Sequence, residues 1–150
     1  MRYVYPKLKR IDSRDGECKC TVKLSENAAK LAKRVGLDFG THEEATHTLT
    51  LAPLAEYGEG VYSKEQFAVT ITENEITIYA DTGRTASYGL KRVHSMQKHG
   101  KIKMGKFRDW PSTPRRGIIE GFYGTPWTLE QEKAAIHQLW ENGMNTYIYS

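Results

Sequence analysis

Two strand patterns with a helix pattern between them occupy the C-terminal part of the sequence, and they constrain its fold more than any other feature. Residues 117–124 have the short apolar pattern of one strand, and residues 144–149 have that of another. Strands joined through a helix pair in parallel, because the crossover returns the chain to the same end of the sheet. Two parallel strands and one helix cannot bury their own faces, so the unit requires further strands and helices.

The helix of this unit has a defined start and end. Thr128 and Gln131 form a capping box, and Gly143 ends the helix. Its expected buried stripe consists of Ile136, Leu139 and Trp140. The chain has 150 residues, too few for a complete (β/α)8 barrel of about 250. We therefore expect residues 114–150 to be the truncated start of a TIM barrel, ending after its second strand.

The preceding part of the sequence predicts a different architecture. Two helices are expected, one after Ser25 that ends at Gly36 and one from about Thr82 to Gly100. Strand-like alternation of apolar and polar residues occurs in residues 17–24, 47–52, 67–72, 76–80 and 101–107, and a turn at 73–75 makes the third and fourth of these a hairpin. This order indicates an α+β fold, a small sheet with two helices on one face.

The two architectures meet in a segment without periodicity. Residues 109–115 contain two prolines and fit neither a helix nor a strand. We place the domain boundary there, with an N-terminal α+β domain at 1–113 and the barrel start at 114–150.

The positive charge of the chain is concentrated in one run. The formal net charge is +4, and residues 91–108 contain no acidic side chain. The basic residues of the run are Lys91, Arg92, Lys98, Lys101, Lys103, Lys106 and Arg108. Such a run fits either an anionic partner or a solvated helix face followed by an edge strand whose lysines discourage strand pairing. The second interpretation is favoured, because no motif of stacking aromatic residues accompanies the run.

The two cysteines and the N-terminus bear on the compartment. Cys18 and Cys20 lie on one face of the first expected strand, where we expect small buried apolar residues rather than a disulfide. Free thiols and the absence of an apolar secretory signal after Met1 predict a cytoplasmic protein, or a secreted one if Met1 is not the native start. No apolar run reaches the ~20 residues of a membrane span.

The histidines do not predict a metal site. His42 and His47 resemble the histidine pair of a zinc-protease helix but are five residues apart, which places them about 140° apart around a helix. We expect them to be solvated loop residues. The sequence thus predicts neither a metal nor a cofactor.

The segment from Arg116 to Trp127 is the candidate for chemistry. In α/β barrels the carboxyl end of each strand and the loop after it form the active-site face. Gly121 lets a ligand approach the backbone closely, and the aromatic rings of Phe122, Tyr123 and Trp127 suit the apolar faces of a sugar. From the residues alone, an aromatic plug over a packed strand end is an equal alternative.

The same segment carries a resemblance to a known family. The sequence Arg-Gly-Ile-Ile-Glu-Gly-Phe-Tyr-Gly-Thr-Pro-Trp-Thr at 116–128, followed by Met-Asn-Thr-Tyr-Ile-Tyr at 144–149, resembles the opening of the glycoside hydrolase family 84 barrel. That family contains β-N-acetylglucosaminidases, including O-GlcNAcases and enzymes named hyaluronidases. Residues 17–107 are similar to the α+β domain that precedes the barrel in bacterial members, and family 20 hexosaminidases carry a similar domain.

The resemblance implies roles for a few residues. Gly121 matches a residue that contacts bound N-acetylglucosamine, and Tyr123 matches a pocket residue. Glu120 is not the family's general acid, and its implied role is a hydrogen bond inside the barrel. The catalytic pair of adjacent aspartates and the substrate-binding lysine lie beyond these 150 residues. The chain alone is therefore expected to be inactive and to contain no catalytic residue.

The resemblance also implies the reaction. The expected function of a full-length protein is removal of β-linked N-acetylglucosamine from a glycan or glycoprotein by substrate-assisted retaining hydrolysis, without a metal or cofactor. The alternative is a non-catalytic module whose basic stretch 91–108 binds acidic polysaccharide or, less favoured, nucleic acid. No membrane partner is expected.

Overall fold

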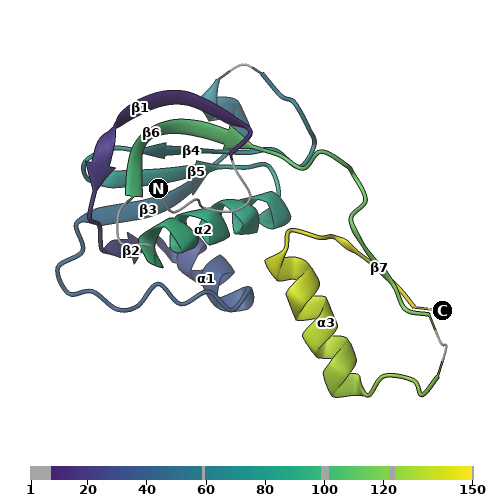
Figure 1. Ribbon diagram of the computed structural model, residues 1–150. Coiled ribbons are helices and arrows are strands. Elements are labelled where there is room, and N and C mark those ends of the chain that lie inside the picture. Colours follow the sequence, from purple (N-terminus) through teal and green to yellow (C-terminus); the bar gives the residue numbers. More distant parts are fainter. Residues whose placement is uncertain (1–7, 59, 99–101, 122–123, 150) are drawn as a thin grey trace. The chain divides into compact units, whose positions relative to one another are not determined.

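The computed structural model describes residues 8–58, 60–98, 102–121 and 124–149, and the chain divides into two compact units (Figure 1). The first unit is Met1–Trp110 and the second is Pro111–Ser150. The division falls inside the proline-containing segment in which the sequence places the domain boundary.

One mixed sheet forms the framework of the first unit. Within the described ranges its strands lie in the order β1-β6-β4-β5-β3-β2. Their bounds are β1 Arg10–Cys18, β2 Val22–Leu24, β3 His47–Ala52, β4 Phe67–Ile71, β5 Glu75–Tyr79 and β6 Ile102–Asp109. β3 runs parallel to β2 and β5, whereas β4 is antiparallel to both of its neighbours. The predicted hairpin of β4 and β5 is confirmed, with Thr70 opposite Thr77.

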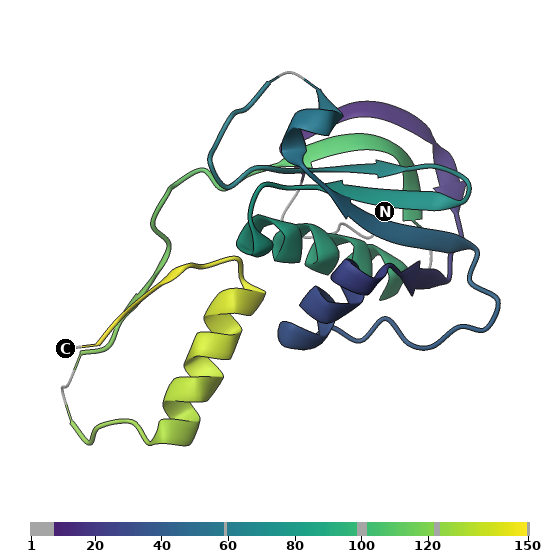
Figure 2. The ribbon, with the colours of Figure 1, turned by 180° about the vertical axis from the view of Figure 1, so that it is seen from behind.

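Two helices cover the same face of this sheet (Figures 1 and 2), as the sequence predicts. They are α1, Glu26–Arg34, and α2, Gly83–Lys98. Ala28 and Ala32 are the buried positions of α1, and α2 buries Ala86, Leu90, Val93 and Met96. Between helices and sheet lies an aliphatic core that is almost fully buried and includes Val22, Leu49, Val69, Ile76, Ile78, Leu90 and Val93.

The predicted strand over residues 17–24 is wrong. β1 ends at Cys18 and β2 begins at Val22, because the two strands pair with different partners, β6 and β3. β1 also begins earlier than predicted, at Arg10. Its residues are mostly exposed and charged, so it lacks the alternation that reveals a half-buried strand. Pairing along β6 rather than burial makes it a strand.

The predicted edge position of residues 101–107 is also wrong. β6 lies inside the sheet, between β1 and β4. Lys103 faces Glu17 across the ladder, and Lys106 is opposite Ser13. The lysines of β6 thus do not protect a free edge.

The cysteines and His47 differ from their predicted surroundings. Cys18 and Cys20 are free thiols and only half-buried, at the margin of the core. His47 is buried at the start of β3, where its Nε2 lies 3.0 Å from the carbonyl oxygen of Thr72 and 3.7 Å from Cys18 Sγ. Its predicted place in a solvated loop is wrong, because pairing of β2 with β3 covers it. In the described ranges, no helix is both long and apolar enough to cross a membrane.

Candidate functional site

The second unit contains the predicted strand, helix and parallel strand. β7 is Gly117–Ile119, α3 is Leu129–Glu141 and β8 is Thr146–Ile148. β7 and β8 are parallel, with Ile118 opposite Tyr147. The first strand ends at Ile119 and does not include residues 120 and 121 of the predicted 117–124, because its ladder partner β8 is itself short; residues 122–123 of that range lie outside the described residues.

The capping box of α3 is confirmed, but its buried stripe is only partly so. The Thr128 hydroxyl accepts from the Gln131 backbone N–H, and the Gln131 side chain accepts from the Thr128 backbone N–H. Of the predicted stripe, Leu139 is buried, whereas Ile136 is 49% exposed. A helix buries its stripe only where another layer covers it.

The amino ends of the two strands are held close together. Arg116 donates its backbone N–H to Asn145 Oδ1 at 3.0 Å and its Nε–H to the Gly143 carbonyl at 2.9 Å. A Cβ at position 117 would lie 1.6 Å from the carbonyl oxygen of Thr146. Only glycine therefore permits this approach of β7 to β8.

The carboxyl ends are joined by Glu120. Its backbone N–H donates to the Ile148 carbonyl at 2.8 Å, which continues the ladder one residue beyond β7. Its side chain is buried, and its Oε2 accepts a hydrogen bond from the Tyr147 hydroxyl. That hydrogen bond to Glu120 raises the pKa of Tyr147 to about 12. The implied role of Glu120 in an internal hydrogen bond agrees with this geometry.

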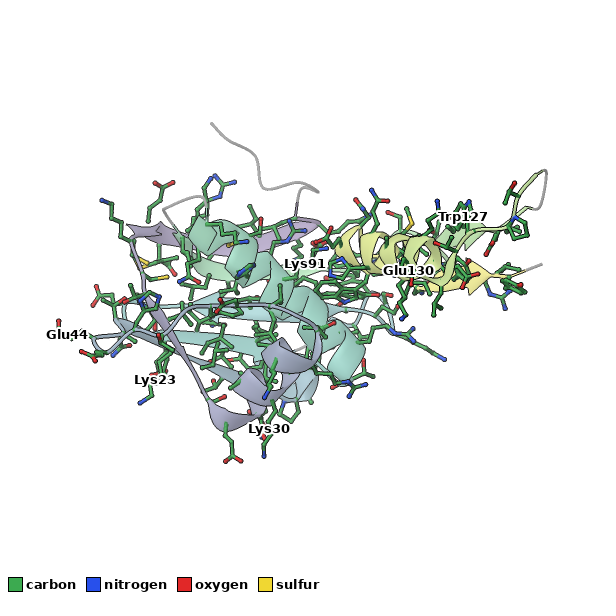
Figure 3. The ribbon with its side chains drawn as sticks, turned by 90° about the horizontal axis from the view of Figure 1, so that it is seen from below. Lys23, Lys30, Glu44, Lys91, Trp127 and Glu130 are labelled. Carbon is green, nitrogen blue, oxygen red and sulfur yellow. The ribbon has the colours of Figure 1, made fainter. Side chains whose placement is uncertain are left out.

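The candidate substrate-binding residues follow Glu120 in the chain. Gly121 is exposed and adjoins Glu120 at the carboxyl edge of the strands. Tyr123 and Phe122 lie outside the described residues. Trp127 is 42% exposed and stands where the chain enters α3 (Figure 3). The described part of the edge therefore offers an open backbone at Gly121, beside a buried carboxylate and a phenol.

Other large apolar side chains of this unit are exposed as well. They are Ile119, Leu129, Ile136, Ile148 and Tyr149. Parallel strands ordinarily have both faces covered. The unit thus presents apolar surface of the kind that additional strands and helices bury in parallel sheets.

A second polar cluster, which the sequence analysis missed, lies in the first unit. Arg108 donates through Nε to Asp12 at 2.9 Å and through a terminal nitrogen to the Gly60 carbonyl at 2.8 Å. The Tyr57 hydroxyl donates to the same Asp12 carboxylate at 2.6 Å, and the Arg108 guanidinium lies 4.7 Å from the Tyr57 ring centre. Because these groups bind one another, we interpret the cluster as a structural clasp rather than a ligand site.

The electrostatics of the clasp favour the ionised carboxylate. Burial alone raises the pKa of Asp12, but hydrogen bonds from Tyr57, Arg108 and Arg10 outweigh it and hold the pKa below its usual 3.8. The same surroundings raise the pKa of Tyr57, first through burial and then through its bond to Asp12.

Some basic side chains of the run 91–108 form ion pairs within the first unit. Arg92 and Asp109 form a buried ion pair at 2.7 Å, and Arg108 is bound to Asp12. Lys98, Lys103 and Lys106 are exposed. No group of three His, Cys, Asp or Glu side chains able to hold a metal ion occurs among the residues that the structure describes.

The candidate edge lies within a segment of the chain that matches a known protein family. Residues 116–150 match the family described as beta-N-acetylglucosaminidase. Over 34 residues the chain is 47% identical to the Protein O-GlcNAcase of Rattus norvegicus, a match that covers 23% of this chain and 4% of that relative. The chain therefore spans only a small part of the curated relative.

Similar folds occur among solved structures over nearly the whole chain. The structure of CpGH84B superposes with a TM-score of 0.73 at 24% identity, covering 99% of this chain and 29% of that one. A GH20 exo beta-N-acetylglucosaminidase from Vibrio harveyi, solved with N-acetylglucosamine, gives a TM-score of 0.65 at 15% identity, covering 96% of this chain and 24% of that one. At these identities the likeness establishes the fold.

Proposed function

We propose that this chain is the N-terminal portion of a glycoside hydrolase family 84 protein, which it matches. On this premise, a polypeptide containing the chain removes β-linked N-acetylglucosamine from glycans or glycoproteins. The observation that carries the proposal is the coincidence of two features. The family match begins at residue 116, and the exposed Gly121 lies within it at the carboxyl edge of two parallel strands. This edge is where α/β barrels bind their substrates.

In this proposal Gly121 contacts the sugar through its backbone. A residue without a side chain leaves the peptide group open to the hydroxyl and amide groups of N-acetylglucosamine. Tyr123 and Trp127 are proposed to face the sugar ring, whose apolar faces suit aromatic side chains. These residues bind and orient the substrate, and none of them exchanges a proton with it.

The proposed reaction is substrate-assisted and retains the anomeric configuration. The oxygen of the 2-acetamido group attacks the anomeric carbon while a carboxylic acid protonates the leaving oxygen, and water then opens the resulting ring. The two carboxylates required for these steps are expected downstream of this chain. Residues 1–150 alone are therefore proposed to be inactive.

The second unit is proposed to be the start of the TIM barrel. Its parallel strands are short, and Ile119 and Ile148 are 69% and 46% exposed. Further β/α units would pair with the strands and cover these side chains. The first unit, with its own closed core, is proposed to act as a scaffold that does not touch the substrate.

The experiment compares two polypeptides with a chromogenic N-acetyl-β-glucosaminide. One continues through the whole proposed barrel, and the other is residues 1–150. We expect turnover by the longer polypeptide alone. Turnover by purified residues 1–150 would overturn the placement of the catalytic carboxylates, and inactivity of a folded longer polypeptide would overturn the proposed function.

A further inference from the structure

Two hydrogen bonds tie Glu120 to β8 immediately before the candidate residue Gly121. One is the backbone bond from Glu120 N–H to the Ile148 carbonyl, at 2.8 Å. The other joins the Tyr147 hydroxyl to Glu120 Oε2. Because they act on the backbone and on the side chain of the same residue, Glu120 is held at two points.

The strand geometry explains why Tyr147 is the partner. Side chains two residues apart in a strand share a face, so Glu120 lies on the same face as Ile118. Ile118 is the register partner of Tyr147. The Tyr147 hydroxyl thus reaches the carboxylate of Glu120, which lies two residues beyond Ile118 on the same face. A buried carboxylate is costly without a donor, which makes this bond a strong restraint on the Glu120 side chain.

We propose that the hydrogen bond from Tyr147 to Glu120 positions the backbone of Gly121 for the N-acetylglucosamine ring. This inference rests on the proposed function. Gly121 has no side chain that could hold it in place, and it is one peptide bond from the restrained Glu120. Tyr147 and Glu120 are therefore positioning residues, which act on the substrate through Gly121.

The proposal predicts an effect on binding rather than on the chemical step. A misplaced Gly121 weakens contacts that the bound substrate and the transition state share, so KM rises while kcat changes little. A role confined to stability would lower the melting temperature without changing the KM of the folded protein.

The test uses a polypeptide that continues through the proposed barrel and a chromogenic N-acetyl-β-glucosaminide. Tyr147→Phe removes only the hydroxyl, and Glu120→Ala removes the acceptor. Glu120→Gln keeps an acceptor oxygen in the same place and serves as the conservative rescue. Tyr79→Phe is the matched control, because Tyr79 lies in β5 of the first unit, which is proposed not to touch the substrate, and loses the same atom. Circular dichroism melting reports the stability of every variant.

We expect Tyr147→Phe and Glu120→Ala each to raise KM about tenfold at nearly constant kcat, and the double variant to be no worse than either single one. Glu120→Gln and Tyr79→Phe should stay within about twofold of the unmodified protein. Equal KM values for Tyr147→Phe and Tyr79→Phe, or additive effects in the double variant, would overturn the inference alone. Inactivity of the unmodified polypeptide would overturn the proposed function and this inference together.

Discussion

At the scale of single residues, the Asp12 carboxylate holds the clasp of the first unit together by accepting hydrogen bonds from Arg108 and Tyr57. Asp12 and Arg108 are 96 positions apart, and nothing in the spacing of either residue marks it as a partner of the other. By contrast, Gly121 could be proposed from the sequence as a binding residue, because a glycine at the carboxyl end of an apolar strand lets a ligand approach the backbone closely. The Tyr147 partner of Glu120 required the strand register, which only the structure supplies.

Replacing Asp12 tests the clasp at this scale. Asp12→Asn removes the charge that Arg108 and Tyr57 bind, and the Asp12 side chain is only 16% exposed. We expect a loss of about 2 kcal/mol in unfolding free energy at pH 7, as for hydrogen bonds to a charged group. Urea unfolding measures it, with Asp15→Asn on the same exposed strand as the control.

The pH dependence of this effect follows from the direction of the shift. The pKa of Asp12 is lower in the folded protein than in the unfolded chain, so its contribution is fully present above the unfolded pKa of about 3.9. It is lost as pH falls through the lower folded value. The difference between Asp12→Asn and the unmodified protein should therefore shrink on acidification below pH ~4. A constant difference down to pH ~2 would contradict this assignment.

At the scale of secondary-structure elements, the periodicity of apolar residues predicts those strands and helices that bury one face. β3 has the predicted bounds His47–Ala52, and α2 buries Ala86, Leu90, Val93 and Met96. β1 could not be located in this way, because its residues are mostly exposed and it is defined by pairing with β6. The same pairing turned the expected edge strand into an internal one.

The contact of α2 with the sheet depends on Gly89. A Cβ at this position would lie 2.5 Å from Cγ2 of the fully buried Ile78. We expect Gly89→Ala to destabilise the first unit by about 1–3 kcal/mol through overpacking. Gly83→Ala, at the first residue of the same helix, meets no atom within 4 Å and should be neutral or slightly stabilising. Equal thermal unfolding of the two variants would contradict this packing.

The pairing of β7 with β8 depends on Gly117 in the same way. Gly117→Ala places a Cβ 1.6 Å from the Thr146 carbonyl, a backbone atom that cannot move aside without breaking the ladder. We expect loss of amide protection in β7 and β8 by hydrogen exchange, with the first unit unchanged. Gly124→Ala, which meets nothing within 4 Å, is the control. Retained protection in Gly117→Ala would disprove the close approach.

At the scale of the whole molecule, the two units are built differently. Met1–Trp110 surrounds an aliphatic core, whereas Pro111–Ser150 exposes Ile119, Ile148 and the α3 residue Ile136. This exposure agrees with the expectation from the sequence that two parallel strands and one helix cannot bury their own faces. The family match at residues 116–150 coincides with the exposed unit and includes its candidate edge.

The central proposal is that this chain is the N-terminal part of a β-N-acetylglucosaminidase. A comparison of two substrates tests it most directly. A polypeptide that continues through the proposed barrel is assayed with a chromogenic N-acetyl-β-glucosaminide and with the matching β-glucoside, which lacks the 2-acetamido group. If the substrate supplies its own nucleophile, the first compound is hydrolysed with retention of configuration and the second is not. Comparable hydrolysis of both compounds, or of neither, would contradict the claim.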